Sequence, residues 1–296
     1  KGSVIPRYSG LPTVLKENGY YNLFFMTHEG QYDNMNAFFR TNGYDEVFSQ
    51  ENYPADKVVN SFGVQDDFLY DYAIPVLNQR AATGEPFFAT LLSISNHPPY
   101  VIPPFFHPKT SEPETQIVEY ADWALRKFFE EARKQPWFDN TIFVLEGDHG
   151  KLVGDAECEL PESYNHIPLM IYSSRIHPEE KNTFGGQVDI QPTILGLLNI
   201  DYLQNNFGVD LLKEERPCMF YTADNMIVGR NDTLLYLYNY ETQQEFTYHI
   251  DNGKLKAVPM DDRFLPLKEY SFSMLQSAEF LVKHGKTVNS VPVTQQ

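Results

Sequence analysis

The pattern of apolar and polar positions along the chain predicts alternating strands and helices. Short runs rich in β-branched and aromatic residues predict a strand at Tyr21 to Met26 and a buried strand at Pro86 to Ser95. Helices are predicted at Leu11 to Asn18, Asn34 to Asn42, Asp66 to Arg80 and Thr115 to Gln135, and the last of these shows apolar residues at helical spacing. Because helices alternate with strands, we expect a largely parallel sheet with helices on both faces.

The last of these helices is expected to be amphipathic and to lead into a further strand. Its apolar positions are Val118, Ala121, Ala124, Leu125, Phe128 and Phe129. The run Ile142 to Leu145 follows, with a turn-forming Asn before it and Gly-Asp-His-Gly after it. This pattern predicts a buried central strand of the sheet.

The pattern changes after about residue 205. Short aromatic-rich strands are predicted at residues 217–222, 226–230, 233–240 and 245–250, separated by Asp-Asn, Asn-Asp and Asp-Asn-Gly turns. This arrangement predicts a small antiparallel meander, closed by a helix from Ser271 to His284. The expected fold class is therefore α/β, as one domain with an α/β core at 1–205 and antiparallel strands with a terminal helix at 206–296.

Composition limits the possible partners. A chain of 296 residues with 42% hydrophobic residues is long enough for one large core. Its net charge of −17 argues against nucleic acid or an anionic membrane surface as partner, although an acidic surface also serves solubility alone. Cys158 and Cys218 are too few to indicate a disulfide framework, and the longest apolar runs are only of strand length.

Asp148 and His149 are the first candidate site residues. They follow the predicted strand Ile142 to Leu145, and ligands of open α/β sheets bind at the carboxyl ends of strands. A carboxylate oxygen beside an imidazole nitrogen suits Zn²⁺ or Mn²⁺, and the flanking glycines allow the backbone to approach an ion closely. The alternative is that Asp148 caps the next helix and His149 packs beneath it.

Four segments resemble the lipoteichoic acid synthase and sulfatase branch of the alkaline phosphatase superfamily. Their order along the chain is the order found in that family, which is more specific than any one segment alone. They are Ser9 to Tyr20 (SGLPTVLKENGY), Trp137 to Gly150 (WFDNTIFVLEGDHG), His166 to Tyr172 (HIPLMIY), and Gly185 to Leu195 (GGQVDIQPTIL) with Leu198 to Asp201 (LNID).

The resemblance implies an alkaline phosphatase-like fold and one divalent metal ion, Mn²⁺ or Zn²⁺ before Mg²⁺ or Ca²⁺, held in part by Asp148 and His149. In that family the nucleophile, together with an acidic metal ligand, precedes the segment that resembles Ser9 to Tyr20. Neither can be assigned in this chain, so the sequence is expected to be a sulfatase-like catalytic domain without its amino-terminal portion. Such a fragment alone is expected to bind metal weakly and to turn over poorly.

His97 and Asn34 are the expected substrate-binding residues. His97 follows the strand Pro86 to Ser95 among prolines, and the resemblance gives a histidine at this position a contact with the substrate phosphate or a second zinc. The alternative is a loop histidine bonded to a neighbouring carbonyl. Asn34 could donate a hydrogen bond to a ligand oxygen or serve only as a helix N-cap.

Two further features of the family pattern bear on substrate. His166 is a candidate for a second metal or an anion contact, or alternatively a strand-entry histidine bonded to the Asp148 loop. Lipoteichoic acid synthases carry a Trp-Asn-Arg that binds glycerol phosphate where this chain has Asp33-Asn34-Met35. That difference argues against polyglycerol phosphate synthesis.

The sequence therefore predicts a metal-dependent hydrolase or transferase for sulfate or phosphate esters, with substrates that are lipid- or glycan-linked in some relatives. The family resemblance implies an extracytoplasmic location, with the membrane reached only through a missing amino-terminal region. One alternative is a phosphoglycerol or phosphoethanolamine transferase of cell-envelope lipids or glycans. Another is a degenerate, non-catalytic domain that binds an anionic glycan or a partner protein.

Overall fold

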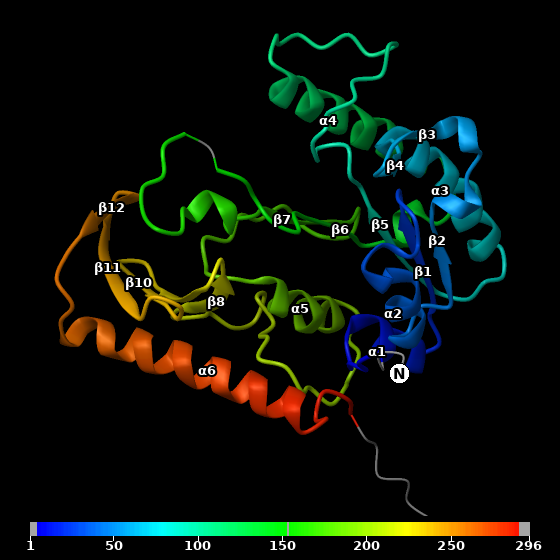
Figure 1. Cartoon of the computed structure of the whole chain (residues 1–296). Coiled ribbons are helices and arrows are strands. Elements are labelled where there is room, and N and C mark those ends of the chain that lie inside the picture. Colours follow the sequence, from blue (N-terminus) through cyan, green and yellow to red (C-terminus); the bar gives the residue numbers. More distant parts are fainter. Residues whose placement is uncertain (1–4, 153, 290–296) are drawn as a thin grey trace, which may run out of the picture. The chain divides into compact units, whose positions relative to one another are not determined.

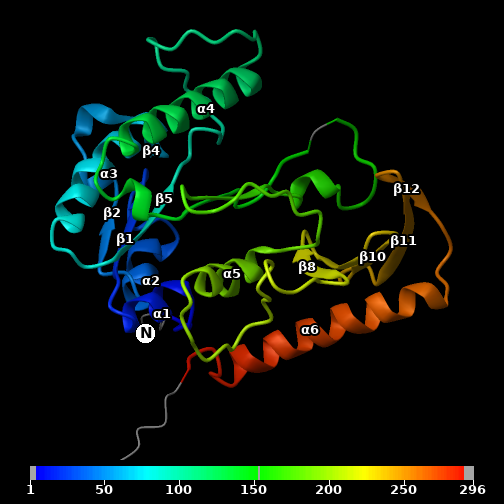
Figure 2. The ribbon, with the colours of Figure 1, turned by 180° about the vertical axis from the view of Figure 1, so that it is seen from behind.

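The structure is a computed structural model that describes residues 5–152 and 154–289 (Figure 1). Its contacts group the chain into two compact units, Lys1–Thr141 and Ile142–Gln296. Figure 2 shows the same ribbon from behind, with the first unit in blue to blue-green and the second in green to red. The division of one domain at residue 205, expected from the sequence, stays a prediction.

A three-stranded parallel sheet forms the centre of the first unit. Its order is β2 (Glu46–Phe48), β1 (Tyr21–Met26) and β5 (Phe87–Leu92), with Tyr21 opposite Phe87 and Leu23 opposite Glu46. The helices are α1 (Leu11–Glu17), α2 (Met35–Thr41), α3 (Asp66–Ala81) and α4 (Pro113–Ala132). A short hairpin of β3 (Val58–Asn60) and β4 (Gly63–Val64) completes the unit.

Helices cover both faces of this sheet, as the alternation of elements predicts. On one face Phe24 stacks on Phe39 of α2, with ring centroids 3.9 Å apart. On the other face Phe25 stacks on Phe48, which in turn contacts Tyr72 of α3. Because successive side chains of a strand point to opposite faces, β1 is buried on both sides and is the central strand of the unit.

Two expectations about burial in the first unit are wrong. Every residue of β5 is half-buried, although a continuous apolar run predicts a buried strand. In α4 the buried residues are Ile117, Tyr120, Ala124, Phe128 and Ala132, whereas Val118 is 49% exposed. Ala124 and Phe128 are thus buried as predicted, but Ile117 and Tyr120 replace Val118 on the buried face, where the Tyr120 hydroxyl donates to Asp67 on α3.

The second unit begins with an antiparallel strand pair. β6 (Phe143–Glu146) pairs with β7 (Leu169–Tyr172), with Phe143 opposite Tyr172, and the two form a two-stranded sheet. The β6 side chains are half-buried or exposed, which corrects the expectation of a buried central strand. Helix α5 (Ile190–Leu197) follows in the segment where the family resemblance places a helix.

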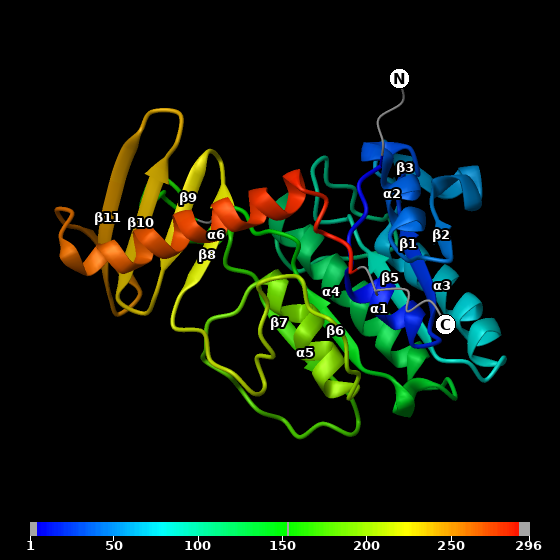
Figure 3. The ribbon, with the colours of Figure 1, turned by 90° about the horizontal axis from the view of Figure 1, so that it is seen from below.

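An antiparallel meander follows, as expected, with five strands where the sequence predicts four. Its strands lie in the order β12 (Lys254–Ala257), β11 (Gln244–Asp251), β10 (Leu234–Asn239), β9 (Met226–Arg230) and β8 (Met219–Ala223). Helix α6 (Leu265–Lys283) crosses one face of these strands (Figure 3) and begins six residues before the predicted start at Ser271. Phe264 and Leu267 pack there against Leu234 and Tyr236.

The other face of the meander packs against the loop that contains Leu160. Val228, Leu235 and Leu237 lie in that core.

Cys158 and Cys218 are both free thiols. Among the described residues, no helix combines the length and the apolar character that a membrane crossing requires.

Candidate active site

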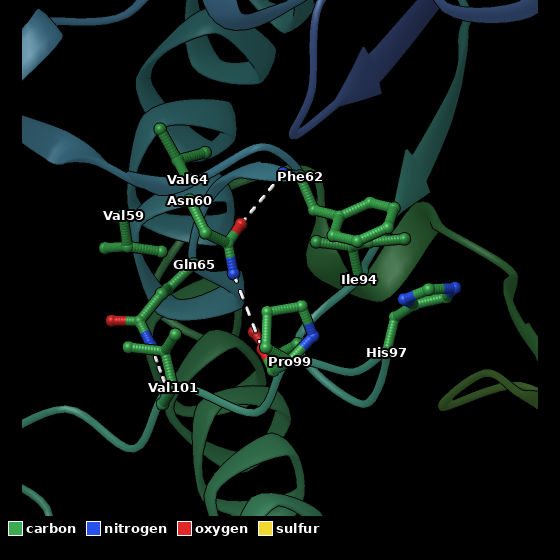
Figure 4. A pocket seen from close by; sticks show the side chains of 10 residues that line it. Val59, Asn60, Phe62, Val64, Gln65, Ile94, His97, Pro99 and Val101 are labelled. Carbon is green, nitrogen blue, oxygen red and sulfur yellow. Dashed lines mark hydrogen bonds between the residues drawn. The ribbon is translucent and has the colours of Figure 1, made fainter.

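The loop after β5 carries His97. Its imidazole is exposed, and it packs against the ring of Phe62 from the β3–β4 hairpin, with centroids 4.2 Å apart (Figure 4). The ring Nδ1 lies 2.7 Å from the carbonyl oxygen of Pro98. Because a carbonyl only accepts hydrogen bonds, this contact places the proton on Nδ1 and leaves Nε2 available. The alternative of a loop histidine bonded to a neighbouring carbonyl is thus confirmed as far as that bond goes. The bond occupies only Nδ1, so Nε2 can still contact a ligand.

A small cavity lies beside His97 under the β3–β4 hairpin. It has a volume of about 10 Å³, and Asn60, Phe62, Gln65 and Ile94 are among its lining residues (Figure 4). That volume holds about one water molecule. His97 therefore presents its free nitrogen from an open loop and not from inside a substrate-sized cavity.

Asn34 lies in the loop after β1, the strand next to β5. It is exposed and occupies the N-cap position of α2, but its side chain makes no capping hydrogen bond. Asp33 and Asn34 both have left-handed backbone conformations, with φ of 47° and 56°. Asn34 therefore stands at the N-cap position of α2, as the alternative expects, but its side-chain amide does not cap the helix. Strained backbone of this kind occurs often at ligand-binding sites.

Glu51 holds this loop in place. Both of its carboxylate oxygens accept from the Gly30 backbone N–H at 3.2 Å, and one also accepts from the Ser49 hydroxyl at 2.6 Å. The Ser49 hydrogen bond, followed by the backbone donors and the nearby His28, holds the pKa of Glu51 below its usual value. Glu51 is therefore a carboxylate at neutral pH, and sequence reasoning did not single it out.

Asp148 and His149 form a turn directly after β6. Their side chains are 74% and 70% exposed, and Asp148 Oδ2 lies 3.8 Å from His149 Nε2. His149 Nδ1 lies 2.7 Å from the Gly150 carbonyl oxygen, so its Nε2 is the nitrogen left for a ligand. The next helical segment is the 3₁₀ turn Glu162–Tyr164, whose N-cap residue is Pro161. The alternative in which Asp148 caps a helix and His149 packs beneath it is therefore wrong.

Backbone hydrogen bonds fix this turn within the second unit. The Gly150 N–H donates to the Tyr164 carbonyl at 2.8 Å. The Gln187 side-chain amide donates to the carbonyls of Asp148 at 2.9 Å and Gly147 at 3.2 Å. Sequence reasoning recognised Gln187 only as part of the segment Gly185 to Leu195. Its role depends on a contact between residues about forty positions apart, which no local pattern reveals.

His166 lies two residues after Tyr164, whose carbonyl accepts the hydrogen bond from Gly150 in the turn. Its backbone N–H donates to the Glu162 carbonyl at 2.8 Å, and its side chain is exposed. The bond between this segment and the Asp148–His149 turn is made by Gly150 and Tyr164. The proposed second-metal or anion contact of His166 stays a prediction.

The donor set of the turn fits a divalent metal in part. A carboxylate oxygen and an imidazole Nε2 are ligands that Zn²⁺ and Mn²⁺ accept, and the bond from Nδ1 to a carbonyl is the usual support of a metal-bound histidine. Among residues 5–152 and 154–289, no group of three or more histidine, cysteine, aspartate or glutamate side chains is arranged to hold a metal ion. Asp148 and His149 are therefore two candidate ligands, fewer than the three that a metal site in a protein commonly has.

We expect Gly150→Ala to weaken metal binding by about 10- to 100-fold. A Cβ at this position would lie 2.0 Å from the Ser163 carbonyl oxygen, so the turn that carries Asp148 and His149 must move. Gly147→Ala is the matched control in the same turn, because its Cβ would lie 3.3 Å from the Ile167 side chain and 3.5 Å from the His149 carbonyl oxygen, with no contact below 3 Å. Titration with Zn²⁺ or Mn²⁺ measures the effect, and equal affinities in the two variants would contradict it.

Comparison with known proteins confirms the resemblance stated from the sequence. A family model described as "Sulfatase" matches residues 3–200. Lipoteichoic acid synthase 1 of Bacillus subtilis (strain 168) is 26% identical over 274 residues, which are 84% of this chain and 41% of that protein. Lipoteichoic acid synthase 2 of the same organism is 25% identical over 230 residues, 69% of this chain and 35% of that protein. This chain therefore spans about two fifths or less of the length of these relatives.

Solved structures show the same fold. A protein of the alkaline phosphatase superfamily from Vibrio parahaemolyticus has a TM-score of 0.81 and 25% identity, covering 96% of this chain and 70% of that one. The lipoteichoic acid synthase LtaP from Listeria monocytogenes has a TM-score of 0.79 and 22% identity, covering 93% and 73%. The expected α/β class, with a parallel sheet, a carboxyl-terminal antiparallel sheet and a closing helix, is thereby confirmed.

Proposed function

Because this chain belongs to the sulfatase family, whose enzymes hydrolyse or transfer sulfate and phosphate esters, we propose that it supplies two metal ligands and an ester-binding histidine to such an enzyme. The observation that carries the proposal is the turn of Asp148 and His149. Its carboxylate and its Nε2 atom are both exposed and 3.8 Å apart, on a backbone held by Gly150 and Gln187. Such a rigid, accessible pair suits metal binding better than packing.

Asp148 and His149 would hold one divalent metal ion, Mn²⁺ or Zn²⁺ before Mg²⁺ or Ca²⁺. When bound, such an ion withdraws charge from a phosphoryl or sulfuryl oxygen and activates a nucleophile. The pKa of Glu146, at the end of β6, is raised first by burial and then by the negative charge of Asp148. A cation at the turn would offset that charge. A complete site of this kind would need a nucleophile and further ligands besides these two side chains.

His97 would contact the ester oxygens. With Nδ1–H donating to the Pro98 carbonyl, Nε2 is an acceptor in the neutral ring and a second donor in the imidazolium. A bound phosphate or sulfate ester carries negative charge, which a donor at Nε2 would offset. Asn34, on the loop after the neighbouring strand, would add an amide donor.

The alternatives differ in which molecule would accept the transferred group and in whether the protein catalyses a reaction at all. Two relatives are named lipoteichoic acid synthases, which favours transfer of a phosphoglycerol or related group to a cell-envelope lipid or glycan, and with it an extracytoplasmic site. Asp33-Asn34-Met35 in place of Trp-Asn-Arg argues against glycerol phosphate as the group. A domain that binds an anionic glycan without catalysis would keep the fold and the exposed turn but would not turn over esters.

An ester screen on the intact protein that contains this chain tests the proposal. Turnover of p-nitrophenyl phosphate, bis-p-nitrophenyl phosphate and p-nitrophenyl sulfate is measured in the presence of Mn²⁺, of Zn²⁺ or of a chelator. We expect metal-dependent turnover of at least one ester, reduced on the order of 100- to 1000-fold by His97→Ala because an oxyanion donor is lost. His107→Ala, another exposed histidine of the same unit, is the matched control.

The outcomes of this screen separate the candidate functions. Turnover that rises when a lipid or sugar hydroxyl is added indicates a transferase. Binding of sulfated or phosphorylated glycan without any turnover would support the non-catalytic alternative and overturn the proposed enzyme. Turnover that a chelator leaves unchanged would contradict the metal assignment.

A further inference from the structure

The loop that carries His97 depends on one buried carboxylate. Asp66 Oδ1 accepts two hydrogen bonds, from the backbone N–H of Ile94 at 2.9 Å and from that of Ser95 at 3.0 Å. In return the Asp66 backbone N–H donates to the Ser95 hydroxyl at 3.1 Å. Ile94 and Ser95 lie two and three residues after the end of β5, and only Asn96 separates Ser95 from His97.

Asp66 is itself firmly placed. It is 2% exposed and is the first residue of α3, where the free N–H groups of the helix favour a negative charge. Leu69, Ala73 and Leu77 bury the same helix against the unit's core. Burial raises the pKa of Asp66, while the N–H groups of Ile94 and Ser95 oppose that shift. A buried carboxylate of this kind is costly unless its hydrogen bonds are kept.

The carboxyl-terminal end of the loop is also hydrogen-bonded close to the start of α3. Gln65, directly before Asp66, donates from Nε2 to the Val101 carbonyl at 2.6 Å (Figure 4). Phe62, on the hairpin that leads into α3, packs against the His97 ring. The loop is therefore bound at both ends, by Asp66 and Gln65, to the start of one helix, with His97 at its exposed tip.

We propose that Asp66 is a positioning residue that fixes His97 through the backbone of Ile94 and Ser95. The proposal rests on the proposed function of His97 only for its effect on turnover, since the placement of the ring is measured independently. Asp66 is buried, and its carboxylate accepts hydrogen bonds from the loop backbone, so it would act on the ester only by way of His97. A group held about 1 Å out of place costs on the order of 100-fold in rate.

The first experiment follows the His97 ring by NMR in the 296-residue chain. Its Cε1–H resonance is assigned by its loss in His97→Ala. Asp66→Ala is expected to move this resonance towards that of an unstructured histidine and to leave His249, in the other unit, unchanged. Asp66→Asn keeps an oxygen acceptor at the same place and is expected to retain the native resonance. Asp71→Ala, an exposed acid of the same helix paired with Lys127, is the matched control.

The second experiment measures ester turnover by the intact protein. Asp66→Ala is expected to lower kcat on the order of 100-fold, with rescue by Asp66→Asn, and to have no further effect in a His97→Ala background. A His97 resonance that stays in place in a folded Asp66→Ala protein, or losses that add in the double variant, would overturn the proposal. If His97→Ala alone leaves turnover unchanged, the role of His97 fails, while the resonance still decides whether Asp66 places the ring.

Discussion

Replacing Asp148 and His149 together with alanine is expected to lower bound Zn²⁺ or Mn²⁺ in the intact protein from about one ion per chain to background. The double variant removes a carboxylate oxygen and an imidazole nitrogen that lie 3.8 Å apart in one turn. Because a metal ion supplies several kcal/mol of transition-state stabilisation, ester turnover is expected to fall on the order of 1000-fold or more. Elemental analysis and the ester screen measure the two effects.

The stability of the double variant separates ligand loss from unfolding. Both side chains are about three-quarters exposed, so the thermal midpoint is expected to stay within a few degrees of the native value. Asp155→Ala with His177→Ala removes another exposed acid and another exposed histidine of the same unit, and serves as the control. Metal content that is the same in both double variants would refute the assignment of the turn as a metal site.

Gly63→Ala is expected to destabilise the first unit by about 3 kcal/mol or more. Gly63 has a φ of +89°, and a Cβ there would lie 1.8 Å from the Thr27 carbonyl oxygen and 2.9 Å from the His28 Cα. These are backbone atoms at the carboxyl end of the central strand, so the β3–β4 hairpin must move instead. The displaced hairpin would take Phe62 away from the His97 ring. Urea unfolding measures the loss of stability.

Gly84→Ala is the matched control for this effect. Gly84 has a similar φ of +77°, but no atom lies within 4 Å of the position that its Cβ would take. The control therefore carries only the conformational cost of a left-handed residue, about 1 to 2 kcal/mol. Equal destabilisation by the two substitutions would mean that the close approach to Thr27 does not restrict the hairpin.

The long elements of the fold could be predicted from local pattern. β1 lies where the sequence predicts it, and α3 differs from the prediction by one residue at its end. The short strands β2, β3 and β4 were missed, because two or three residues carry no periodicity. The antiparallel pairing of β6 with β7 was also missed, since strand direction is decided by tertiary contacts that the alternation of helices and strands does not encode.

The candidate site was predictable to the extent that it follows strand ends. His97, Asp148 and His149 stand out as ligand-type side chains after apolar runs, but that pattern alone is weak, and the family resemblance decides in favour of a site. Asp66 and Glu51 were missed for the opposite reason. An acid at the start of a helix or in a loop is ordinary, and only the structure shows that each accepts backbone hydrogen bonds from a loop with a candidate ligand residue.

The order of strands in the meander has a consequence for how the polypeptide reaches its native state. Every strand from β8 to β12 pairs with its neighbour in sequence, and only residues 231–233 separate β9 from β10. β1 and β5, by contrast, pair across residues 27–86. Pairing two strands that are close in sequence costs less chain entropy than closing a long loop between them. Sheets with mostly local pairing therefore fold faster. The meander is therefore the section that can assemble first as a nucleus, ahead of the parallel sheet.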